Sequence, residues 1–150
     1  MSTSLTFASL RREQEYGKLD QRNPTLKRVL DGAAEYAFAE WGWILCIGDI
    51  FRTREESLAT DAKSTGPGGL GMGRPAGSIS PHCVWAAADV VKIRNVPPEQ
   101  VAALVEWINA TWIYRPGDTR HVVASAKPHG TGPHIHVQVC SETVLRGRAA

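Results

Sequence analysis

Two histidines stand one residue apart in the stretch PHIHVQV, residues 133–139. Apart from these histidines the stretch is short and apolar, which is typical of a β-strand. Side chains two residues apart on a strand point to the same face and lie roughly 7 Å apart. His134 and His136 can therefore address one metal ion or one bound group. The alternative is that they are polar surface residues of a half-exposed sheet.

A catalytic zinc site needs further ligands, because zinc typically takes three protein ligands and keeps one position for water. His82 and Asp89, in the stretch SISPHCVWAAADVV, are the candidates, and they stand seven positions apart. In one straight strand their side chains would lie on opposite faces, roughly 23 Å apart. On a helix they would stand roughly 10 Å apart along the axis. The chain must therefore turn between a loop that carries His82 and a strand that carries Asp89.

Asp89 lies within the apolar run AAADVV. An ionised carboxylate in such a setting is costly unless it is paired, so a buried Asp89 requires a cation. This favours a metal ligand over the alternative, in which the aspartate simply ends an apolar run.

The elements that must position these residues follow from periodicity. Asn23 is a suitable N-cap, Pro24 suits the first helical position, and apolar residues at helical spacing predict a helix that ends near Gly42. A second helix is predicted over residues 97–112. The glycine-rich residues 61–80 predict a long loop. Four short apolar segments predict strands over residues 43–51, 83–93, 121–126 and 133–139.

This order of elements predicts an α+β fold, with a small, mostly antiparallel sheet and helices packed on one face. A length of 150 residues and a hydrophobic content of 43% suit a single domain, which we place at residues 23–150. Residues 1–22 are polar and weakly patterned, and we interpret them as an N-terminal arm or irregular lead-in.

Charge and hydropathy exclude some classes of partner. The 17 basic and 15 acidic side chains are scattered and leave a net charge of +2, so no stripe can follow a phosphate backbone and we expect no nucleic-acid partner. No segment approaches the roughly 20 apolar residues of a membrane helix, so we expect no membrane insertion. The first residues lack the pattern of a secretory signal peptide, which predicts synthesis in the cytoplasm.

The segment SISPHCVWAAADVV resembles the S-x-H-x-x-G-x-A-x-D signature of the hedgehog and D-Ala-D-Ala peptidase family of zinc proteins. The matched positions are Ser80, His82, Ala87 and Asp89. Trp85 stands where the signature has glycine, at the place where the chain must turn. Either the backbone there avoids a positive φ or the turn is built differently.

Two further segments are similar to the same family. PHIHVQV resembles its H-x-H strand, at His134 and His136, and IGDIFRTREES resembles the segment that carries its substrate-binding arginine. That arginine would be Arg52, with Arg54 as the alternative. The three segments run from about residue 44 to residue 139, in the order found in the family.

The resemblance implies a Zn²⁺ ion held by His82, Asp89 and His136. His134 would lie beside the metal and act in catalysis, by stabilising the oxyanion or moving a proton. Arg52 would bind a substrate carboxylate.

The remaining signature residue, Ser80, would orient the substrate backbone or cap its loop. Many of these peptidases place an acidic base three residues before the final ligand, and this chain has none at that spacing. The branch of the family with H-x-H has a histidine at the position of His134 instead.

The implied function is that of a zinc metallopeptidase that cleaves peptide bonds in the stem peptides of bacterial peptidoglycan. The expected site of action is the cell wall, after release or as part of a phage particle, with other virion proteins as partners. The alternative is a non-catalytic, zinc-binding structural or virion-associated module of the same fold. Trp85 and the missing acidic base keep that alternative open.

Overall fold

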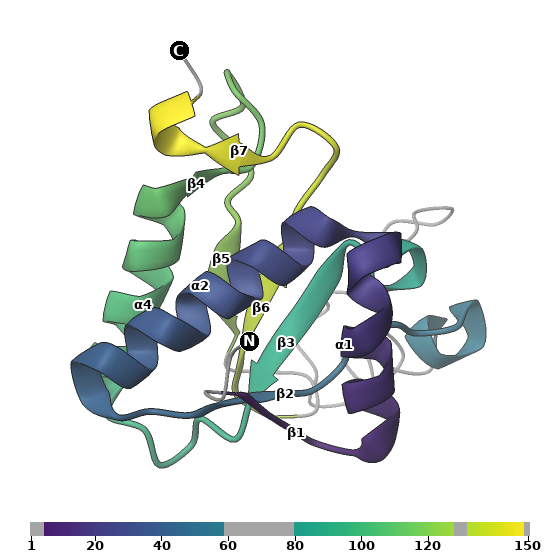
Figure 1. The fold of residues 1–150 in the computed structure, drawn as a ribbon, viewed down its shortest axis with the longest axis horizontal. Coiled ribbons are helices and arrows are strands. Elements are labelled where there is room, and N and C mark those ends of the chain that lie inside the picture. The colour runs from purple at the N-terminus through teal and green to yellow at the C-terminus, as the bar shows by residue number, and fades with distance from the viewer. Residues whose placement is uncertain (1–4, 59–79, 128–131, 149–150) are drawn as a thin grey trace, which may run out of the picture.

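A five-stranded sheet with helices against one face forms the body of the chain (Figure 1). The computed structural model describes residues 5–58, 80–127 and 132–148. The predicted loop over residues 61–80 lies outside this part of the chain, except for Ser80. The helices and strands are β1 (Leu5–Phe7), α1 (Leu10–Arg22), α2 (Pro24–Trp41), β2 (Leu45–Ile47), β3 (Ala87–Val91), α4 (Pro98–Thr111), β4 (Trp112–Ile113), β5 (Ala124–Lys127), β6 (His134–Gln138) and β7 (Val144–Leu145), with short 3-10 helices η1 (Pro81–Val84) and η2 (Arg146–Arg148).

The strand order in the sheet is β1-β2-β3-β6-β5. β1 pairs with β2 in parallel, and the three other pairings are antiparallel. The fold is therefore α+β with a mixed sheet in which antiparallel pairing predominates, as the sequence predicts. β4 and β7 form a separate two-stranded ribbon that the sequence pattern did not indicate.

Local capping explains why α2 begins and ends where predicted. The Asn23 side chain accepts a hydrogen bond from the backbone N–H of Leu26 at 3.1 Å, and Pro24 follows as the first helical residue. Gly42 ends the helix in the left-handed conformation, with φ of 66°, which costs glycine little. The second predicted helix is confirmed as α4.

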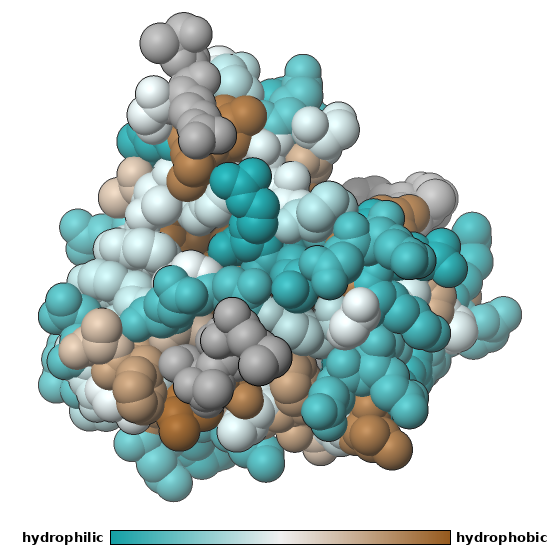
Figure 2. All heavy atoms as spheres, viewed as in Figure 1, coloured by the Kyte–Doolittle hydropathy of each residue, from teal (hydrophilic) through white to brown (hydrophobic). Residues whose placement is uncertain are grey.

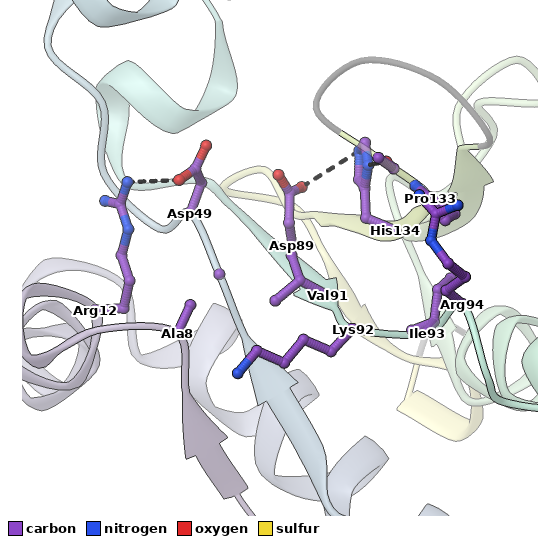
Figure 3. Close-up of a pocket in the computed structure, with 12 residues that line it drawn as sticks. Ala8, Arg12, Asp49, Asp89, Val91, Lys92, Ile93, Arg94, Pro133 and His134 are labelled. Atoms are coloured by element: carbon purple, nitrogen blue, oxygen red, sulfur yellow. Dashed lines mark hydrogen bonds and ion pairs between the residues drawn. The ribbon is translucent and has the colours of Figure 1, made fainter.

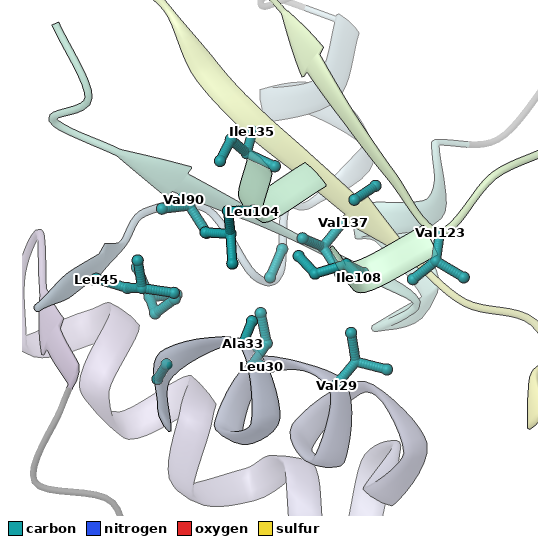
Figure 4. Close-up of a cluster of buried hydrophobic side chains, with 14 of the residues drawn as sticks. Val29, Leu30, Ala33, Leu45, Val90, Leu104, Ile108, Val123, Ile135 and Val137 are labelled. Atoms are coloured by element: carbon teal, nitrogen blue, oxygen red, sulfur yellow. The ribbon is translucent and has the colours of Figure 1, made fainter. Parts of the chain in front are cut away.

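The hydrophobic core lies between the sheet and the pair of helices α2 and α4 (Figure 4). Side chains alternate along β6, so Ile135 and Val137 enter the core while His134 and His136 take the opposite face. The outer surface over α1 and α2 is mainly hydrophilic (Figure 2), as expected for helices that turn their apolar side inward. The labelled core residues are Val29, Leu30 and Ala33 of α2, Leu104 and Ile108 of α4, and Leu45, Val90, Val123, Ile135 and Val137 of the sheet and its flank.

The interpretation of residues 1–22 as an arm or irregular lead-in is wrong for residues 5–22. Residues Leu5–Phe7 extend the sheet beside β2, and α1 begins at an N-cap, Ser9, and buries Leu19 completely in the shared core. The helix contains few apolar residues, and it also buries Glu15, which forms ion pairs with Arg11 and Arg12. None of the helices in the described part of the chain has the length and apolar character that a membrane crossing requires.

Candidate metal centre

Three side chains that are far apart in the sequence meet on the face of the sheet opposite the core helices. His82 comes from η1, Asp89 from β3 and His136 from β6, and their potential ligand atoms all lie within 4.8 Å of one another. Asp89 and His136 are direct partners across the antiparallel β3–β6 pair, which places both side chains on the same face. This group of two imidazoles and one carboxylate is one that can hold a metal ion.

The turn that brings His82 back to Asp89 occurs at Trp85. Trp85 has φ of 60° and ψ of 26°, the left-handed conformation that glycine adopts most easily. The backbone N–H of Ala86 donates to the carbonyl of Pro81 at 2.9 Å, which closes the turn. The positive φ therefore occurs despite the bulky side chain, at a cost of about 1–3 kcal/mol.

Contacts of the Trp85 ring and carbonyl hold this conformation in place. The indole stacks on Phe51 with ring centroids 4.8 Å apart and an interplanar angle of 17°. The Asn23 side-chain amide donates to the Trp85 carbonyl at 3.1 Å. Such an aromatic stack contributes about 0.5–1.5 kcal/mol beyond its buried area, which offsets part of the strain.

Three imidazole nitrogens face one oxygen of Asp89. The Oδ1 atom lies 3.4 Å from Nε2 of His82, 3.2 Å from Nδ1 of His136 and 4.0 Å from Nε2 of His134. The His82 and His136 rings stand nearly edge to face, 5.3 Å apart at their centroids. His134 is adjacent to the group of three ligands without being part of it.

The other nitrogen of each potential histidine ligand contacts an acceptor. Nδ1 of His82 lies 3.1 Å from the carbonyl oxygen of Ile50, and Nε2 of His136 lies 3.2 Å from Oε1 of Gln138. The amide of Gln138 is oriented by its own NH₂, which donates to the carbonyl of Val122 at 3.3 Å. Because these oxygens only accept, an imidazole that binds a metal through its inner nitrogen can keep its proton on the outer nitrogen.

His134 follows the same pattern, since its Nδ1 lies 2.9 Å from the carbonyl oxygen of Gly132. With the outer nitrogens protonated, three bare lone pairs point toward the Asp89 carboxylate. That arrangement is repulsive unless a cation or additional protons lie between them. The donor set and its hydrogen bonds therefore fit a divalent metal ion.

Asp89 is ionised in this setting. Burial raises its pKa, but when no metal is bound, hydrogen bonds from His136 and His82, which need protons on their nitrogens facing Asp89, and the charges of nearby imidazoles outweigh burial and hold the pKa well below the ordinary value. The carboxylate is thus available as a metal ligand.

The second oxygen of Asp89 is held by Arg52. Nη2 of Arg52 donates to Oδ2 at 3.3 Å, and its Nε donates to Asp49 at 2.8 Å. Arg12 of α1 contacts the other oxygen of Asp49 and also Glu15. This chain of ion pairs runs from the N-terminal helix to the metal centre and leaves Oδ1 of Asp89 facing the imidazoles.

Arg52 was expected to bind a substrate carboxylate, and the structure places its guanidinium between two carboxylates of the chain itself. Its side chain is 13% exposed. A substrate contact by Arg52 stays a prediction and would have to compete with Asp49 and Asp89. Arg54, the alternative, is exposed.

Ser80 caps η1, the short helix that carries His82. It is 2% exposed, and its hydroxyl accepts a hydrogen bond from the backbone N–H of His82 at 3.3 Å. Of the two expected roles, capping is therefore visible, and substrate contact stays a prediction.

Replacing this cap tests which role matters. We expect Ser80→Ala to lower the free energy of unfolding by about 1 kcal/mol, because the buried N–H of His82 loses its acceptor. Urea denaturation of the metal-free protein measures this, with the exposed Ser141→Ala as the matched control. An unchanged free energy of unfolding together with a raised KM would favour the substrate-binding role instead.

A pocket of about 290 Å³ lies beside the metal centre (Figure 3). Asp89 and His134 form part of its wall, and Figure 3 shows the two side chains directed toward each other. Its other lining comes from the start of α1, the end of β2 and the segment after β3. The pocket therefore gives a ligand access to the side of the centre on which His134 stands.

Comparison with known proteins adds no further assignment: no model of a protein family matches the chain, and neither a curated protein nor a solved structure was found to match it.

Gln138 and Asp49 belong to this site and were not among the residues singled out from the sequence. Gln138 continues the alternation of His134 and His136 on β6, so strand periodicity alone places it on the same face. No local sequence pattern predicts that Asp49 and Arg12 belong to the site, because their positions depend on how α1 and β2 meet in the folded chain.

Gln138 offers a direct test of the hydrogen-bond pattern around the ligands. We expect Gln138→Ala to weaken zinc binding by about 10–100-fold, as is usual when an outer partner of a histidine ligand is lost. Competition against a chromophoric zinc chelator measures the affinity, with the exposed Gln14→Ala as the matched control. Equal zinc affinity for the parent and Gln138→Ala would show that this contact does not orient His136.

Proposed function

We propose that this chain is a zinc-dependent peptidase that hydrolyses peptide bonds in the stem peptides of bacterial peptidoglycan. The observation that carries the proposal is the convergence of His82, Asp89 and His136 on one face of the sheet, with His134 next to them. These residues are the ones that resemble the metal site of the hedgehog and D-Ala-D-Ala peptidase family. We propose that the fold belongs to the same type.

The donor set supports zinc as the proposed metal. Two imidazoles and one carboxylate, without a thiolate, are ligands that catalytic zinc uses and that leave a coordination position open. A zinc ion held there supplies Lewis acidity toward a scissile carbonyl and a water molecule. Protonation of the imidazoles competes with the metal, so zinc binding should weaken on acidification.

His134 is the residue we assign to proton transfer or oxyanion stabilisation. Its Nδ1 is engaged with the carbonyl of Gly132, which leaves Nε2 directed toward the centre and the pocket. Asp49, the other carboxylate of the pocket, is held by Arg12 and Arg52 on its two oxygens. Among the described residues of the pocket wall, His134 is thus the group best placed to hold or move a proton.

The proposed substrate and setting rest on the family resemblance. Stem peptides of the cell wall are the substrates that this resemblance implies, with action after release or within a phage particle and with other virion proteins as partners. The alternative is a zinc-binding structural module of the same fold, in which the metal holds η1, β3 and β6 together and nothing is hydrolysed.

Digestion of purified peptidoglycan distinguishes these possibilities. The full chain is first loaded with zinc and its metal content measured, and muropeptides are then followed by mass spectrometry with and without a chelator. The proposal expects one zinc per chain and new peptide ends that disappear on chelation. One bound zinc with no new peptide ends would contradict the peptidase and favour the structural module.

A further inference from the structure

Side chains of helix α1 hold the backbone of the segment that follows β2. The backbone N–H of Phe51 donates to Oε1 of Glu15 at 3.2 Å. The carbonyl oxygen of Phe51 accepts from Nη1 of Arg12 at 2.9 Å and from Nη2 of Arg11 at 3.1 Å. Both polar backbone groups of Phe51 are therefore engaged by one helix.

The same segment contacts His82 on its other side. The carbonyl oxygen of Ile50 lies 3.1 Å from Nδ1 of His82, and the backbone N–H of Arg52 donates to the carbonyl of His82 at 3.3 Å. The Ile50 carbonyl and the Phe51 N–H belong to one peptide group, and in a trans peptide they point in opposite directions. This peptide group therefore lies between the Glu15 carboxylate and the His82 imidazole.

Glu15 is a buried charge whose presence the fold alone does not require. The residue is 5% exposed, and its oxygens accept from Nε of Arg11 at 2.9 Å and from Nη1 of Arg12 at 2.8 Å. Replacing a buried ion pair by apolar residues of similar size is often neutral or stabilising. An apolar residue at position 15 could not, however, accept the hydrogen bond from the N–H of Phe51.

We propose that Glu15 is a positioning residue of the metal centre, which acts on His82 through the peptide group between Ile50 and Phe51. The inference rests on the metal site of the proposed function and adds to it a residue of helix α1. When His82 binds zinc through Nε2, its Nδ1–H donates to the Ile50 carbonyl. A carboxylate at the other end of the peptide group strengthens this hydrogen bond, because successive hydrogen bonds polarise one another.

Two effects on the metal follow from this arrangement. The fixed carbonyl of Ile50 keeps the His82 ring in the orientation in which Nε2 faces Oδ1 of Asp89 at 3.4 Å. The stronger acceptor at Nδ1 also makes Nε2 a better donor of electrons to the metal. Outer partners of histidine ligands typically contribute about 10–100-fold to metal affinity. Because Glu15 acts through a peptide group, we expect the lower end of this range.

Two substitutions at position 15 separate this role from the ion pairs with Arg11 and Arg12. Glu15→Gln removes the charge but keeps an oxygen that can accept from the N–H of Phe51. Glu15→Asp keeps the charge but is one methylene shorter, which withdraws the oxygen from Phe51. Leu19→Ala is the matched structural control, because it weakens the packing of α1 in the core and leaves the Glu15 side chain intact.

Zinc affinity of the full chain is measured by competition against a chromophoric chelator, after urea denaturation has shown that each metal-free variant folds. Glu15→Asp should bind zinc about 10-fold more weakly than the parent, whereas Glu15→Gln and Leu19→Ala should stay close to the parent. In NMR spectra of the zinc-loaded proteins, the Nδ1 proton of His82 should exchange faster with water in Glu15→Asp than in the other variants.

Parent-like zinc affinity in Glu15→Asp would overturn the inference. Equal losses in Glu15→Asp and Glu15→Gln, or in Glu15→Asp and Leu19→Ala, would also overturn it, because they would assign the effect to charge or to the stability of α1. Failure of the proposed peptidase has a different signature: the zinc affinities follow the expected order while purified peptidoglycan is not cleaved. A parent that binds no zinc would refute the inference and the metal centre together.

Discussion

Asp89→Asn is expected to weaken zinc binding by more than about 100-fold. Loss of a direct ligand must cost more than loss of an outer partner, which typically costs about 10–100-fold. Asparagine keeps the shape of the side chain and can still accept the hydrogen bond from Arg52. The change therefore removes the charge that faces His82 and His136 at 3.4 and 3.2 Å while the packing is retained.

Zinc-dependent stabilisation measures this effect. A ligand that binds the folded state raises the melting temperature, so zinc should raise Tm for the parent and have little effect on Asp89→Asn. Asp49→Asn is the matched control, because Asp49 contacts Arg52 without facing the imidazoles, and it should retain most of the zinc effect. The same rise in Tm for Asp89→Asn and the parent would exclude Asp89 as a ligand.

His134→Gln is expected to retain zinc and to lose about 10²–10⁴-fold in kcat on peptidoglycan peptides. Positioned acid–base groups typically contribute factors of this size. His134 stands 4.0 Å from Oδ1 of Asp89 and lies outside the group of three ligands, so the metal should stay bound when its imidazole is removed.

The matched control for this change is His121→Gln. His121 is exposed, contacts Asp118 and stacks on Tyr114, and it does not line the pocket. Its replacement should leave both zinc content and kcat unchanged. Parallel loss of zinc and activity in His134→Gln would show that His134 is a metal ligand. Unchanged activity would show that His134 has no role in catalysis.

The elements predicted correctly are those whose causes are local in the chain. α2 has its cap at Asn23 and its terminator at Gly42 within one segment, so sequence alone indicated both ends. The shared face of His134 and His136 was predictable because side chains two residues apart on a strand point to the same side of the sheet.

The elements that were missed are stabilised by contacts between distant segments. α1 is held by Leu19 in the core and by pairs such as Arg12 with Asp49, 37 residues away, and neither leaves a periodic signal. Likewise, β1 is recognisable only by its parallel pairing with β2.

In the candidate site, too, the features with local causes were predicted and those that depend on distant segments were not. The sequence indicated that the chain must turn between His82 and Asp89, and it does so at Trp85. It did not indicate that a tryptophan would take the left-handed conformation, because the supporting stack with Phe51 comes from a distant segment. The pairing of Arg52 with Asp89 was not indicated for the same reason, because the two residues stand 37 positions apart in the sequence.

Anomalous diffraction at the zinc edge, from crystals of the full chain grown with one equivalent of zinc, locates the metal itself. We expect a single strong peak within bonding distance, about 2.0–2.2 Å, of an imidazole nitrogen of His82, an oxygen of Asp89 and an imidazole nitrogen of His136. A peak bound elsewhere on the chain, or no peak between these three side chains, would contradict the metal centre and with it the peptidase.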